Sequence, residues 1–143
     1  MTLQTGMMLL AAKMPLDMMI SKMSEGMVET LKIFFLTLLF SLPLGLVIAF
    51  GRMAKNRIIR YIVTVYIAIM RGTPLMLQVM AIYFGPNYLL HIRIPRSYRF
   101  IAIIVAFALN YAAYFAEIYR SGIESMPVGQ YEAARLLGYN KAQ

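Results

Sequence analysis

The stretch IFFLTLLFSLPLGLVIAFG, residues 33–51, decides the fold class because it contains no charged side chain. As an α-helix it is roughly 28 Å long at about 1.5 Å per residue, which matches the hydrocarbon thickness of a bilayer. Ser41, Gly45 and Ala49 recur at every fourth position, so this face lets another helix backbone approach closely. Pro43 is expected to kink the helix locally. We therefore predict a membrane-spanning helix.

The composition of the whole chain agrees with a membrane protein. Hydrophobic residues make up 61% and charged residues 14%, with a mean hydropathy of +0.67, whereas soluble domains average about a quarter charged residues. The net charge is +8, but the basic residues form short groups between uncharged stretches, as in loops that flank membrane helices. This spacing argues against a nucleic-acid-binding module, in which they would line one element.

Several kinds of chemistry are excluded by what the sequence lacks. With no cysteine and a single histidine, His91, the chain offers no disulfide framework, thiolate zinc site or histidine metal cluster. No glycine-lysine-serine/threonine motif is present, so the chain has no P-loop and cannot itself be an ATPase. No paired carboxylates or nucleophile-base pair occurs in or near the apolar stretches, so we do not expect an enzyme.

A second apolar stretch, residues 61–90, is long enough for one tilted helix but is interrupted by Arg71, Gly72, Thr73 and Pro74. An arginine at membrane depth costs at least ~2.5 kcal/mol, so it is expected to face the bundle, a wet cavity or a carboxylate, or to reach an interface. Pro74 frees a backbone carbonyl that Thr73 or a neighbouring helix can satisfy. We favour a structural or gating role for Arg71 over substrate contact.

A third uncharged stretch, residues 100–116, ends directly before Glu117 and predicts another span. Asn110 within it needs an interhelical or water partner, and we rank packing ahead of substrate contact. Glu117 and Arg120 are expected to pair with each other. Small residues form a further ridge on this helix at Ala108, Ala112 and Ala116.

The sequence changes character after Glu117, because charged, small and apolar residues alternate. Residues 128–137 contain good helix formers, with Pro127 in a first turn and Gly138 as a C-terminal cap. Such a short amphipathic helix outside the membrane suits docking into a groove of a partner protein.

These residues carry a resemblance to the integral permease subunits of binding-protein-dependent ABC importers, whose EAA loop has the form EAA, three residues, then glycine. Here the motif is Glu132, Ala133, Ala134 and then Gly138. The polar-amino-acid branch adds an AY.AEI.R.GI segment, which is similar to residues 113–123, and a GQ pair, here Gly129 and Gln130. It also has RGTPL, found here at 71–75 with Gln78 beyond it, and a G...TL opening at Gly26, Thr30 and Leu31.

The resemblance implies an all-α membrane protein with the MetI-like, multi-span permease fold, which has five spans in the family. Here it implies an N-terminal tail at 1–25, a permease domain at 26–143, spans at about 28–51, 59–85 and 99–117, and the EAA coupling loop at 124–143. The implied place is the bacterial cytoplasmic membrane, with the loop in the cytoplasm. The implied partners are an ABC ATP-binding subunit that holds the ATP, a second permease subunit, an extracytoplasmic solute-binding protein and membrane lipid.

Roles follow for individual residues from the same resemblance. Contact with the ATPase is expected from Gly129, Gln130, Tyr131, Glu132, Ala133, Ala134 and Gly138. A place in the translocation path or its gate is expected for Arg71, Gly72, Thr73, Pro74 and Asn110. Positioning of the loop is expected from Glu117 and Arg120. No cofactor or metal is expected in the chain itself.

In the family the signature continues beyond Gly138 into an Ile-x-Leu-Pro segment and two more spans, whereas this sequence ends at Gln143. We therefore expect a C-terminally truncated permease for a polar amino acid or an opine. The alternative is a non-transporting membrane interaction or assembly protein, or an inactive gene fragment. The methionine-rich first residues are expected to form an amphipathic or disordered lead-in near the membrane surface.

Overall fold

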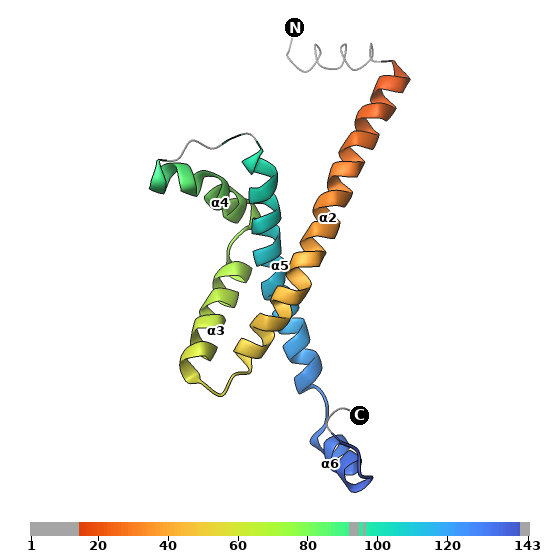
Figure 1. Ribbon diagram of the computed structural model, residues 1–143, viewed down its shortest axis with the longest axis vertical. Helices are drawn as coiled ribbons and strands as arrows, with labels where there is room; N and C mark the ends of the chain where they lie inside the picture. Colours follow the sequence, from red (N-terminus) through yellow and green to blue (C-terminus); the bar gives the residue numbers. More distant parts are fainter. Residues whose placement is uncertain (1–14, 92–94, 96, 141–143) are drawn as a thin grey trace. The chain divides into compact units, whose positions relative to one another are not determined.

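The computed structural model describes residues 15–91, 95 and 97–140, which form helices and no strand. The helices are α2 (Leu16–Arg52), α3 (Arg57–Gly72), α4 (Leu75–Leu90), α5 (Tyr98–Glu124) and α6 (Val128–Leu136) (Figure 1). The chain divides into two compact units, Met1–Leu36 and Thr37–Gln143, so the first part of α2 and the rest of the chain are described separately.

In the first unit, α2 begins at Leu16, well before the span expected at 28–51. The whole helix has 37 residues, so it is roughly 55 Å long and exceeds the thickness of a bilayer. Asp17 lies in its first turn, where a negative charge is favourable beside the helix dipole. Residues 16–25 of the expected tail are therefore helical, and residues 1–14 of that tail lie outside the described ones.

The predicted second span corresponds to two helices, α3 and α4, which meet at an angle of 107°. Pro74 explains the break, because it lacks the N–H that would continue the ladder and its ring crowds the preceding turn. Thr73 accordingly adopts an extended conformation, with φ −115° and ψ 143°. By length and composition, α2 and α5 are each able to cross a membrane, and α3 with α4 can provide a third, bent span.

In the second unit, the core lies where α5 packs against α3 and the last part of α2. Small residues make this contact possible, as the sequence predicted: a Cβ atom added to Gly45 would lie 2.7 Å from Cβ of Phe115 and 3.2 Å from the carbonyl oxygen of Ala112. Tyr66 on α3 also donates a 2.6 Å hydrogen bond to the carbonyl of Leu109. The buried residues of this core are Ala49, Ile67, Ala113 and Ala116.

Candidate functional site

The helix that carries the EAA residues is α6, and none of its residues is buried. It follows α5 after residues 125–127. Pro127 precedes the first turn with φ −60°, and its carbonyl accepts a 3.0 Å hydrogen bond from the N–H of Gln130. Proline has a fixed φ that suits a helix start, and it has no N–H that would need a hydrogen-bonding partner there. Pro127 therefore defines where α6 begins.

The end of α6 is equally well defined. Gly138 has φ +80°, its N–H donates to the carbonyl of Arg135 at 3.1 Å, and the N–H of Tyr139 donates to the carbonyl of Ala134 at 3.0 Å. These two bonds form a Schellman motif, which satisfies carbonyls that the helix end leaves free. A side chain at this φ is disfavoured, so Gly138 is required by the backbone as the sequence predicted.

One face of α6 borders a groove with a volume of about 720 Å³. Tyr131 and Ala134 line it together with Arg135, whereas Leu137 is 76% exposed and lies outside the lining. Glu132 is exposed, and it forms no ion pair with Arg135 within the described residues. Apolar, amide and guanidinium groups border the groove together: Met126, Gln130, Tyr131, Ala134, Arg135, Tyr139 and Asn140.

A second polar arrangement lies at the joint between α3 and α4. In an unbroken helix the carbonyl of Met70 would accept a bond from residue 74, but Pro74 has no N–H. Two side-chain amides replace that donor: Nε2 of Gln78 and Nδ2 of Asn110 each lie 3.0 Å from the Met70 oxygen. The neighbouring helix α5 thus helps to satisfy the freed carbonyl, which was one of the two predicted possibilities.

Thr73, Gln78 and Asn110 form one network around this carbonyl. Nδ2 of Asn110 also donates to Oε1 of Gln78 at 3.0 Å, and Nε2 of Gln78 lies 2.8 Å from Oγ1 of Thr73. Asn110 is 6% exposed, so its amide depends on these partners. The role of Gln78 was not predicted from the sequence, although its position one helical turn after Pro74 places its amide near the carbonyl that Pro74 frees.

Arg71, at the end of α3, is exposed and lies apart from that network. Its guanidinium carbon is 5.3 Å from the centroid of the Tyr114 ring on α5, a distance suited to a cation–π contact. Within the described residues no carboxylate forms an ion pair with Arg71. Of the four residues that interrupt the apolar stretch, Thr73 and Pro74 therefore belong to the joint, while Arg71 contacts a tyrosine.

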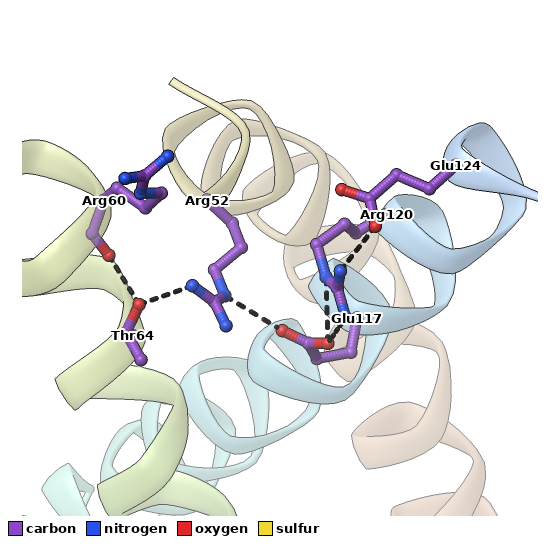
Figure 2. A network of polar contacts seen from close by, with 6 residues as sticks. All are labelled: Arg52, Arg60, Thr64, Glu117, Arg120 and Glu124. Carbon is purple, nitrogen blue, oxygen red and sulfur yellow. Dashed lines mark hydrogen bonds and ion pairs between the residues drawn. The ribbon is translucent and has the colours of Figure 1, made fainter. Parts of the chain in front are cut away.

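Glu117 and Arg120 form the predicted pair on α5. Nη2 and Nε of Arg120 both donate to Oε2 of Glu117, at 2.8 Å and 3.1 Å, and such hydrogen bonds between charged groups are stronger than neutral ones. Arg120 also forms an ion pair with Glu124 in the last turn of α5. The pair is thus part of a larger group of charges at the end of the helix that leads to α6 (Figure 2).

Arg52, at the end of α2, extends this group to two further helices, which the sequence did not reveal (Figure 2). Its Nε lies 3.4 Å from Oε1 of Glu117, and its Nη1 donates to Oγ1 of Thr64 on α3 at 2.6 Å. The Thr64 hydroxyl donates in turn to the carbonyl of Arg60. One feature of the sequence hints at the contact between Arg52 and Glu117: each residue directly follows an uncharged stretch.

The chain belongs to the family of binding-protein-dependent transport system inner membrane components, whose model matches residues 41–143. It is similar to the arginine transport system permease protein ArtQ of Bacillus subtilis, with 42% identity over 114 residues, covering 80% of this chain and 51% of that protein. The putative glutamine transport system permease protein GlnP of Rickettsia prowazekii is 38% identical over 117 residues, covering 82% of this chain and 52% of that protein.

A crystal structure of an amino acid ABC transporter with histidines has the same fold, with a TM-score of 0.74 and 36% identity, covering 91% of this chain and 60% of that one. The chain spans about half the length of the curated relatives that it matches. The expected all-α membrane fold and the resemblance to amino acid ABC permeases are confirmed by these matches.

Proposed function

We propose that this chain provides the permease part of an ABC importer for a polar amino acid in the bacterial cytoplasmic membrane. The observation that carries the proposal is α6: the EAA residues form a helix without buried residues, with a defined start and a glycine-capped end, directly after α5. A separate subunit hydrolyses ATP, because the sequence has no P-loop. The family match supports this reading.

In this proposal α6 sits in a cleft of the ATP-binding subunit. Tyr131 and its neighbours along the groove contact that subunit, and Glu132 faces it from the exposed side of the helix. Because only residues 125–127 separate α6 from α5, a movement of α6 acts directly on α5, which packs against the other helices. A second permease subunit and an extracytoplasmic solute-binding protein complete the importer.

The substrate is proposed as a class. The relatives are named for glutamine, arginine, nopaline and L-cystine transport, which supports an amino acid with polar groups or an opine as the substrate. The joint around Thr73, Pro74 and Asn110 is the proposed gate, because it is the point at which a buried polar network meets a broken helix. The non-transporting alternative is not favoured by these comparisons.

The ATPase contact is tested by replacing Tyr131, which lines the groove and is 54% exposed. With the chain in lipid nanodiscs, we expect Tyr131→Ala to weaken capture of the purified ATP-binding subunit by on the order of tenfold, because buried tyrosines often dominate interfaces. Tyr88→Ala is the matched control, since Tyr88 is 81% exposed on α4. Capture that is unaffected by Tyr131→Ala, or weakened equally by both changes, would rule out this contact.

The glycine cap gives a second prediction. Gly138→Ala places a side chain at φ +80°, which costs roughly 1–2 kcal/mol and loosens the last turn of α6. In the assembled transporter, we expect ATPase stimulation by the binding protein to fall several-fold in this variant, with unchanged amounts of permease in the membrane. Gly122→Ala is the control, because Gly122 has no neighbour within 4 Å and no positive φ. Equal stimulation in both variants would show that the cap does not matter for coupling.

A further inference from the structure

Four charged side chains form a line of alternating sign from the last turn of α5 to the end of α2. Glu124 pairs with Arg120, Arg120 with Glu117, and Glu117 with Arg52 (Figure 2). Glu124 lies four residues before the first residue of α6. The line therefore joins the end of α5, which leads to the proposed coupling helix, to α2 and, through Thr64, to α3.

The contacts along this line differ in length. Glu117 and Arg120 are joined at 2.8 Å, and Arg52 and Thr64 at 2.6 Å, but the contact between Arg52 and Glu117 is 3.4 Å. The longest contact is thus the one that joins α5 to α2. If it opens, Glu117 keeps Arg120 and Arg52 keeps Thr64, so neither charge is left without a hydrogen-bonding partner.

The surroundings of the contact favour a reversible one. The side chains of Arg52 and Glu117 are 28% and 20% exposed, so both can be reached by water when they separate. The apolar packing of Gly45 and Ala49 holds α2 to α5 further along the helix. An ion pair that is partly exposed contributes modestly to stability, so its loss leaves the bundle folded.

From these observations we propose that Arg52 and Glu117 form a releasable latch that holds the end of α5 in its resting position. The proposal rests on the function proposed for α6. Displacement of α6 by the ATP-binding subunit pulls the end of α5, the Arg52–Glu117 contact opens, and Arg52 stays on Thr64. Arg52 is therefore a positioning residue: it sets how readily movement of α6 reaches the spans.

The latch itself is tested in the chain alone, whose lack of cysteine gives labelling without background. Spin labels are attached to cysteines at Phe50 on α2 and Ile123 on α5, which are 58% and 46% exposed. In nanodiscs, Arg52→Gln keeps a donor for Thr64 but removes the charge, and we expect a broader distance distribution reaching longer values. An unchanged distribution overturns the proposal.

Two further variants make this measurement specific. Arg52→Lys keeps the charge and is expected to fall between the wild type and Arg52→Gln. Lys32→Gln is the control, because it removes an exposed ion pair of 3.0 Å with Glu29 in the first unit, and it should leave the distribution unchanged. Broadening by Lys32→Gln equal to that of Arg52→Gln would show a general charge effect and overturn the latch.

The consequence for coupling is measured in the assembled transporter. We expect Arg52→Gln to raise ATPase activity in the absence of binding protein by about two- to fivefold, the range for losing a partly exposed ion pair. A lower thermal stability with unchanged ATPase activity would indicate a scaffold and overturn the latch. If the wild type itself shows no response to the binding protein, the proposed function is contradicted, and the label distances alone decide whether the latch exists.

Discussion

Gly45→Val is expected to destabilise the helix bundle more than any other single change considered for this chain. The added Cβ would lie 2.7 Å from Cβ of Phe115 and 3.2 Å from a backbone oxygen of Ala112. Neither atom is the flexible end of a side chain, so α2 and α5 must separate. Overpacking of this kind costs typically about 1–3 kcal/mol, and the separation also uncovers Ala49 and Ala116, which are fully buried.

The expected result is a large fall in the unfolding temperature of the chain in nanodiscs, with a smaller fall of the same sign for Gly45→Ala. Gly85→Val is the matched control, because it places the same residue in a helix where no atom lies within 4 Å of the added Cβ. Any intrinsic cost of valine in a helix is common to both variants. Equal unfolding temperatures of Gly45→Val and Gly85→Val would show that the close approach of α2 and α5 does not limit stability.

The close approach was predictable because it depends on local spacing. Small residues at every fourth position share a helix face, so the ridge with Gly45 could be identified without knowing its partner. The break at Pro74 was predictable for the same reason, since proline removes a donor wherever a helix is placed. The start of α2 at Leu16 was not, because a charge such as Lys32 bounds the apolar stretch without ending the helix.

Contacts between residues that are far apart in the chain could not be predicted from the sequence. Arg52 and Glu117 are 65 positions apart, and nothing in the periodicity of either helix fixes which side chains face each other. The pair of Glu117 and Arg120 was predictable, because residues three apart in a helix lie on the same face. Arg71 shows the same limit. The cost of an arginine in a membrane predicted that Arg71 has a partner, but only the structure shows that the partner is the ring of Tyr114.

Asn110→Leu is expected to have the second largest effect, by removing a buried donor from the α3–α4 joint. The carbonyl of Met70 then keeps only Gln78, and Oε1 of Gln78 loses its donor from Asn110. An unsatisfied buried polar group costs about 1–3 kcal/mol, while hydrogen bonds between membrane helices average nearer ~0.6 kcal/mol. We therefore expect a loss of about 1–2 kcal/mol in the free energy of unfolding.

The joint should also become less well defined. Spin labels at Ile62 on α3 and Tyr88 on α4, both exposed, report the angle between these helices, and we expect a broader distance distribution in Asn110→Leu. Thr37→Val is the control for stability, because Thr37 is as buried as Asn110 at 6%, but its hydroxyl has no partner within the described residues. Removing that hydroxyl should be neutral or stabilising.

The double variant Gln78→Leu/Asn110→Leu separates a cooperative network from two independent bonds. Both single changes break the bond between Asn110 and Gln78, but only the double change leaves the Met70 carbonyl without either amide donor, so the combined cost should differ from the sum of the two single costs. Strict additivity would mean that Gln78 and Asn110 act independently on the Met70 carbonyl. A departure from additivity would show that the broken helix is held by one network, which is the property that a gate between two defined positions requires, because its members form and release their bonds together.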